Sequence, residues 1–120
     1  MSCLERHLRQ TGLPVIGRAG QDALRDATVL IVGCGALGTV TAELLARSGV
    51  GTLVIVDRDL VEYSNLSRQV LFSEKDAARS TPKAEAARTR LGRIDPEVRV
   101  RAFVEDISSE NVEGLTKGST

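Results

Sequence analysis

A glycine turn between apolar segments constrains the fold of this chain more than any other feature. The stretch LIVGCGALG, residues 30–38, places Gly33, Gly35 and Gly38 in the spacing Gly-x-Gly-x-x-Gly directly after apolar residues. The first glycine permits a tight turn, the second lets the backbone approach a phosphate, and the third lets a helix pack closely on a sheet. The turn therefore predicts a phosphate site, although the spacing alone suits many nucleotides and also serves simple strand-to-helix packing.

The segments on either side of this turn predict a parallel β–α–β unit. Residues 28–33 (TVLIVG) and 52–57 (TLVIVD) are apolar enough for strands that are buried on both faces. Between them, apolar residues recur at helical spacing, and a glycine follows as a stop signal. These residues are Leu37, Val40, Leu44, Leu45 and Gly49.

A long polar connection precedes the next predicted helix. Residues 58–80 are rich in charge and have no sustained period, and we expect Tyr63 and Phe72 to pack this connection onto the sheet. The helix is predicted to begin with Thr81 as N-cap and Pro82 as its first residue. Its apolar face consists of Ala84, Ala87, Leu91 and Ile94.

The predicted elements give an α/β fold class. Residues 98–105 alternate apolar and polar side chains and predict a third parallel strand, and a short helix is expected near residues 108–115. We expect a Rossmann-like parallel sheet with helices on both faces, of which residues 28–120 form only the N-terminal half, a nucleotide-binding half-domain. The chain would then be an inactive fragment, and its unpaired first strand would favour self-association.

Residues 1–27 are predicted to form a helical arm ahead of this half-domain. Polar helical segments are expected at residues 5–10 and 21–25, with a loop between them. His7 is the single histidine of the chain, and we expect it on the surface of the arm rather than as a ligand or a base.

Charge and cysteine content exclude several classes of function. Lys plus Arg and Asp plus Glu number 16 each, so no net field draws the chain to nucleic acid or to a membrane surface. No apolar run approaches the roughly 18 residues of a spanning helix. Cys3 and Cys34 lack metal-ligand and redox-motif spacing, so a reducing cytoplasm is expected.

Acidic and basic residues near the predicted strand ends indicate which nucleotide is bound. Asp57 ends the second strand, where a carboxylate can accept hydrogen bonds from ribose hydroxyls. Arg68 and Lys83 lie near the carboxyl ends of the strands, where two cations can neutralise a triphosphate. This favours ATP over a nicotinamide dinucleotide. In the simpler interpretation both residues are solvated surface charges and Asn65 is a turn residue.

Four segments resemble the ThiF/MoeB/HesA family, the bacterial relatives of ubiquitin-activating enzymes. They are RHLRQ, GQDALRDATVLIVGCGALG, GVGTLVIVDRDLVEYSNLSRQ and TPKAEAARTRL, and together they extend from about residue 6 to about residue 104. The resemblance implies an ATP-dependent adenylyltransferase that activates the C-terminal glycine carboxylate of a ubiquitin-like sulfur carrier protein and releases pyrophosphate. It also implies a homodimer and Mg²⁺ as a cofactor.

The resemblance assigns roles to individual residues. The three glycines of the turn would line the ATP phosphates, Asp57 would hold the ribose, and Asp59 would lie near the metal or the ribose. The segment SNLSRQ and the later lysine would contact the phosphates, through Asn65, Arg68, Gln69 and Lys83. Arg9 matches the arginine that family dimers contribute to the ATP of the partner subunit. Arg9, Arg68 and Lys83 would thus be the catalytic cations.

The chain also departs from the family pattern. His7 occupies a place where tyrosine is common, and the connection from Arg68 to Lys83 is about two residues longer than usual. The aspartate motif for Mg²⁺ and the Cys-x-x-Cys zinc site of the family fall beyond residue 120, so no metal ligand is predicted within this chain. Two other functions stay open, a nicotinamide-dependent oxidoreductase domain and a non-catalytic partner subunit of the same family.

Overall fold

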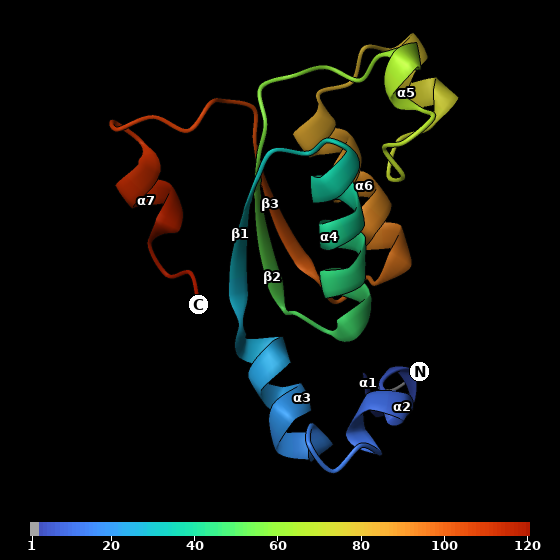
Figure 1. Cartoon of the computed structure of the whole chain (residues 1–120), viewed down its shortest axis with the longest axis vertical. Helices are drawn as coiled ribbons and strands as arrows, with labels where there is room; N and C mark the ends of the chain where they lie inside the picture. The colour runs from blue at the N-terminus through green and yellow to red at the C-terminus, as the bar shows by residue number, and fades with distance from the viewer. Residues whose placement is uncertain (1–2) are drawn as a thin grey trace.

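Three parallel strands form the centre of the molecule (Figure 1). The computed structural model describes residues 3–120, with side chains from Glu5 onward, so the side chain of Cys3 lies outside the described part. The strands are β1 (Thr28–Val32), β2 (Thr52–Val56) and β3 (Arg99–Phe103), in the order β1-β2-β3. Val29 pairs with Leu53, which pairs with Val100. The predicted α/β class and all three predicted strands are confirmed.

Helices cover both faces of this sheet, as predicted (Figure 1). On one face, Leu53 and Ile55 of β2 pack in the main core, which α4 and α6 complete. On the other face, Val54 and Val56 pack against Leu115 of α7. The helices are α4 (Ala36–Ser48), α6 (Lys83–Ile94) and α7 (Val112–Thr116).

The first strand is less buried than its sequence predicts. Only Ile31 of β1 is buried, and the side chain of Val32 is 59% exposed, whereas four of the five residues of β2 are buried. The prediction of burial on both faces is therefore wrong for β1. The reason is its place at the edge of the sheet, where β2 is its one partner strand among the described residues. On the side of β1 that faces away from β2, Thr28 exchanges hydrogen bonds with Thr120 near the end of the chain.

Helix α4 turns a different face to the sheet from the predicted one. Its buried residues are Thr39, Ala42 and Ala46, which are small enough to bring the helix close to the strands. The larger side chains lie outside: Leu37 is 81% exposed and Leu44 is 60% exposed. The apolar spacing predicted the helix correctly but placed these leucines and Val40 on the wrong side, and only Leu45 of the predicted set packs against the core.

Helix α6 follows the prediction more closely. Ala84, Ala87 and Leu91 are buried, and Ile94 packs against the same core. The N-cap is Pro82 rather than Thr81, one residue later than predicted. A proline in this place lacks only an amide hydrogen that the first turn of a helix does not use.

The polar connection between β2 and α6 contains two short helices and is closed at its base. The short helices are η1 (Tyr63–Asn65) and α5 (Glu74–Ala78). At the base, Leu60 pairs with Pro82 in an isolated antiparallel bridge, and the amide of Val61 donates to the carbonyl of Thr81 over 2.8 Å. Phe72 is buried as predicted. The same prediction for Tyr63 is wrong, because its side chain is largely exposed.

The arm that precedes β1 contains three short helices, and polar side chains fasten it to the domain. The amide nitrogens of Gln10 and Gln21 both donate to the carbonyl of Ser48, over 2.8 and 3.0 Å. His7 is only 3% exposed and lies beside Gly49, so the prediction of a surface histidine is wrong. The helices are α1 (Cys3–Arg6), α2 (Leu8–Thr11) and α3 (Gly17–Asp26). Within the described residues, no helix is long and apolar enough to cross a membrane.

Candidate functional site

The glycine turn, residues 33–38, connects β1 to α4 at the carboxyl end of the sheet. Gly33 has a φ of +93°, a conformation that L side chains rarely adopt. A Cβ on Gly38 would collide with the carbonyl oxygen of Gly33, so the helix approaches the turn more closely than any other residue allows. Gly35 is the N-cap of α4 and offers no side chain to the first helical amides. These amides and the helix dipole therefore present a site for an anion.

Asp57 holds the glycine turn against the end of β2. Its Oδ2 accepts the amide hydrogen of Cys34 over 2.7 Å, and its Oδ1 accepts that of Asp59, also over 2.7 Å. Both carboxylate oxygens are thus engaged by backbone donors from two segments. A carboxylate keeps further lone pairs beyond these two bonds, so Asp57 can still accept from a ribose hydroxyl.

Cys34 lies in the turn but is not a nucleophile. The thiol is completely buried. Burial, with a smaller contribution from the nearby Asp57 carboxylate, raises its pKa from 9.0 to about 12, although the Lys83 ammonium acts in the opposite direction. The thiol is therefore protonated at neutral pH, and what this position contributes to the site is its backbone amide.

Gln69 places a buried side-chain amide beside the glycine turn. Its side chain is only 5% exposed, and Oε1 has no hydrogen-bond partner. An ideal Cβ on Gly35 would lie 3.8 Å from its Nε2, which shows that the amide borders the open side of the turn. A buried acceptor without a donor costs about 1–3 kcal/mol, so this oxygen is suited to a donor that arrives with a ligand.

A cavity of about 530 Å³, referred to below as the nucleotide cavity, is lined by residues that follow β2, among them Asp59 and Asn65, and by Lys83. The side chain of Lys83 is buried, and its Nζ lies 3.9 Å from Oδ2 of Asp59. Asn65 is buried too, but its Oδ1 accepts the amide hydrogen of Glu62 over 2.8 Å. That bond makes Asn65 a local cap, consistent with the simpler interpretation of a turn residue.

The structure brings most of the predicted site residues together, with two exceptions. Arg68 is exposed, lies outside the lining of the nucleotide cavity and donates from Nη1 to the carbonyl of Ser64 over 2.8 Å. Arg9 is exposed on α2, and Figure 1 shows this arm at the amino ends of the strands, opposite the glycine turn. Arg9 therefore does not reach the turn of its own chain.

Sequence reasoning missed one residue of the site. Arg58 lines both the nucleotide cavity and a neighbouring hollow of about 170 Å³ between Gly33 and Asp57. An ion pair with Asp106 holds the Arg58 side chain, with Nη1 of Arg58 3.1 Å from Oδ2 of Asp106. The sequence signal that could have identified Arg58 is its position between Asp57 and Asp59, directly after a predicted strand. The described residues contain no group of three or more His, Cys, Asp or Glu side chains that could hold a metal ion.

Comparisons with known proteins identify the family of this chain. The ThiF family model matches residues 7–119. The chain is 45% identical over 115 residues to the sulfur carrier protein ThiS adenylyltransferase of Bacillus subtilis and 43% identical over 105 residues to that of Escherichia coli, covering 96% and 88% of this chain. It spans only 34% and 41% of the lengths of these relatives.

A solved structure that contains ATP shares the fold of this chain. The E. coli tRNA N6-threonylcarbamoyladenosine dehydratase TcdA in complex with ATP superposes with a TM-score of 0.84 at 29% identity. The match covers 92% of this chain and 44% of that one. With a family model matched over nearly its whole length and a fold shared with an ATP-bound relative, this chain belongs to the ThiF family.

Proposed function

We propose that this chain forms the nucleotide-binding part of an ATP-dependent adenylyltransferase that activates the C-terminal glycine carboxylate of a ubiquitin-like sulfur carrier protein. The names of the relatives support this proposal, because they are sulfur carrier adenylyltransferases. The observation that carries it is the glycine turn, where Gly35 leaves the first amides of α4 open and the side-chain Nε2 of the buried Gln69 lies 3.8 Å from the place of a Cβ.

In this proposal the ATP phosphates lie against the glycine turn. The open space at Gly35 accepts a phosphate where a Cβ would stand, and the amides at the start of α4 donate to its oxygens. The side-chain amide of Gln69 borders the same space, and Lys83 and Asn65 line the nucleotide cavity. Arg68 lies outside that lining and would add positive charge by releasing its bond to the carbonyl of Ser64. Asp57 would accept from a ribose hydroxyl, and Asp59 would lie near the ribose or help to hold Mg²⁺.

The reaction needs charge neutralisation more than a general base. An oxygen of the carrier carboxylate attacks the α-phosphorus, the bond from that phosphorus to the bridging oxygen of the β-phosphate breaks, and pyrophosphate leaves. Both reactants are anions, so Lys83 and Arg68 act by positioning them and by stabilising the charge that grows on the leaving group. Mg²⁺, when bound, would supply further positive charge there. Asp59 is the carboxylate of the nucleotide cavity closest to Lys83.

We also propose that the protein acts as a homodimer, with residues 1–27 as an arm and residues 28–120 as the nucleotide-binding unit. Arg9 supports this proposal, because α2, the helix that carries it, lies at the amino ends of the strands (Figure 1), so that Arg9 would serve the ATP of the second copy. The exposed leucines of α4, Leu37 and Leu44, give the apolar surface that an interface between copies requires.

A calorimetric titration with Mg·ATP and, separately, with NAD tests the nucleotide. We expect saturable ATP binding, weakened in Arg68→Ala and unchanged in Arg18→Ala, an exposed arginine of the arm. NAD binding that is indifferent to Arg68 would refute the adenylyltransferase proposal in favour of an oxidoreductase domain. ATP binding that both variants leave unchanged would remove Arg68 from the site.

A further inference from the structure

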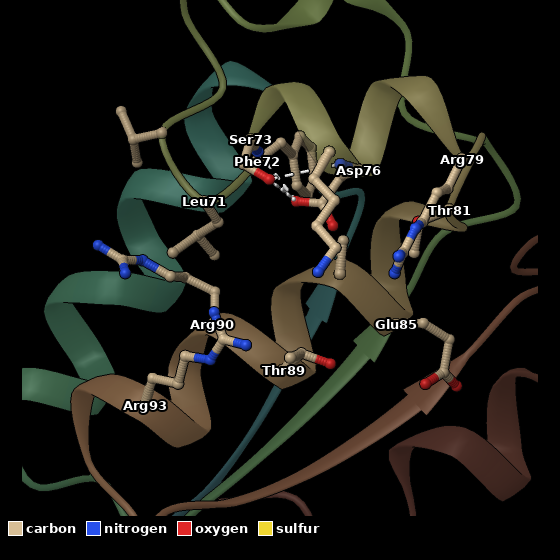
Figure 2. A pocket seen from close by; sticks show the side chains of 13 residues that line it. Leu71, Phe72, Ser73, Asp76, Arg79, Thr81, Glu85, Thr89, Arg90 and Arg93 are labelled. Atoms are coloured by element: carbon tan, nitrogen blue, oxygen red, sulfur yellow. Dashed lines mark hydrogen bonds between the residues drawn. The ribbon is translucent and has the colours of Figure 1, made fainter.

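A further cavity lies outside the nucleotide cavity. It has a volume of about 520 Å³ and lies between the polar connection with α5 and the outer side of α6 (Figure 2). None of the residues that line it also lines the nucleotide cavity. Its volume falls within the range of about 300–1,000 Å³ that is typical of small-molecule sites. This cavity is called the basic pocket below.

Four cations without ionic partners surround the basic pocket. Figure 2 shows Arg79 coming from the end of α5, with Arg90 and Arg93 on α6, and Lys75 of α5 completes the set. Among the described residues, none of these four side chains takes part in an ion pair or a hydrogen bond, although the chain as a whole has equal numbers of basic and acidic residues. Positive charge is therefore concentrated here.

The two acidic residues of the pocket lining are engaged elsewhere. Oδ2 of Asp76 accepts both the amide hydrogen and the hydroxyl hydrogen of Ser73, over 2.9 and 3.0 Å, in the cap of α5. Oε2 of Glu85 accepts from Nη2 of Arg88 over 2.6 Å. Arg90 and Arg93, one helical turn apart, consequently repel each other without a paired acid between them, an arrangement that a bound anion would stabilise.

Two hydroxyl donors and a rigid apolar wall complete the basic pocket. The hydroxyls of Thr81 and Thr89 both belong to its lining, and neither makes a hydrogen bond within the described chain. Leu71 and Phe72 are buried members of the main core, so the wall they form is held in place. Arginine forks and hydroxyl donors together match the several acceptor oxygens of a phosphate group.

We propose that the basic pocket binds a small molecule that carries two or more phosphate groups. Four cations on two facing elements can engage more than one phosphate at once, which a single phosphate does not require. A nucleic acid is disfavoured, because single strands are bound through aromatic side chains that stack on the bases. The one aromatic residue of the lining, Phe72, is buried, and the exposed Tyr63 lies outside it.

Titration of the ¹⁵N-labelled chain with sodium tripolyphosphate, followed by NMR, tests this site separately from the nucleotide cavity. Binding in the basic pocket shifts the amide signals of Thr81, Thr89 and Arg90, whereas binding at the glycine turn shifts those of Gly35 and Gly38. We expect saturable shifts of the first group, with an affinity that falls as salt is added. Absence of these shifts would overturn the proposal, whatever happens at the glycine turn.

Charge-matched variants separate a site from a general effect of net charge. We expect R90Q/R93Q to weaken the binding in the pocket at least about tenfold, while R18Q/K117Q, which removes two exposed cations elsewhere, leaves it unchanged. Arg79→Gln, on the opposite wall, gives an independent test if the double variant does not fold. Equal weakening in both double variants, or citrate binding as tight as tripolyphosphate binding, would overturn the proposal.

Discussion

Replacing Asp57 by Asn tests whether this carboxylate fastens the glycine turn to the sheet. The carboxylate accepts two short hydrogen bonds, from the amides of Cys34 and Asp59. An asparagine side chain has only one acceptor oxygen, so one of these amides would face an NH₂ group instead. Hydrogen bonds to a charged acceptor contribute about 1.5–3 kcal/mol each, and the remaining bond also loses its charge.

The expected loss is therefore about 2–3 kcal/mol of the free energy of unfolding. This is a large part of the total of about 5–15 kcal/mol that is usual for a domain, and it lowers the ratio of folded to unfolded molecules by a factor of about 30–150. Urea denaturation followed by circular dichroism at pH 7 measures it as a lower midpoint with an unchanged slope.

Asp59→Asn is the matched control, two residues further along the chain. The Asp59 carboxylate is exposed and lies 3.8 Å from Arg58, which is exposed too, and 3.9 Å from the buried Lys83. An exposed pair contributes about 0–1 kcal/mol, and the distance to Lys83 is at the upper limit of an ion pair. We expect a loss below about 1 kcal/mol in this variant. If Asp57→Asn destabilises the chain no more than Asp59→Asn, the hydrogen bonds of Asp57 do not fasten the turn and the reasoning is refuted.

Three further predictions concern other parts of the molecule. Gly38→Ala forces a Cβ into the carbonyl of Gly33 and should lower the free energy of unfolding by at least about 2 kcal/mol, measured by urea denaturation. Gly92→Ala, in open space within α6, should instead raise it by about 0.5–1 kcal/mol, and similar effects in both variants would contradict the close approach at Gly38. With Cys3 replaced by Ser, the buried Cys34 should react with a thiol reagent at pH 8 only after unfolding. Because its pKa is raised from 9.0 to about 12, its contribution to stability is present below pH 9 and lost as the pH rises toward 12, so a stability curve that stays flat over this interval would argue against the raised pKa. Leu44→Lys should shift the chain toward the monomer in light scattering without changing its melting temperature, and an unaltered mass distribution would exclude the exposed face of α4 from the interface.

Local patterns in the sequence predict the elements of this fold well, and they fail where a distant contact decides the outcome. Residues 52–57 predict β2 correctly because a central strand needs a continuous apolar run. The large apolar residues of α4 mislead because Ala42 and Ala46 are the ones that fit against the sheet. His7 becomes buried through its neighbour Gly49, some forty positions along the chain, which no local pattern reveals.

The candidate site also combines features that the local sequence predicts with features that depend on distant contacts. The positions of Gly33, Gly38 and Asp57 follow from backbone geometry at the end of a strand, and the sequence predicts them. The missing partner of Gln69 Oε1 and the two amides on Asp57 depend on tertiary packing, so only the structure reveals them.

Because the base of the polar connection is closed, the position of Lys83 does not depend on the length of this segment. The bridge between Leu60 and Pro82 and the 2.9 Å bond from the Lys83 amide to the carbonyl of Asp59 hold the two ends of the connection together. Residues inserted between these ends lengthen the loop without moving its base, at an entropic cost of only about 0.6 kcal/mol for each doubling of loop length. The connection from Arg68 to Lys83 can therefore lengthen among relatives while the lysine keeps its place, and variation in this stretch can remodel the outer wall of the molecule independently of the chemistry at the sheet.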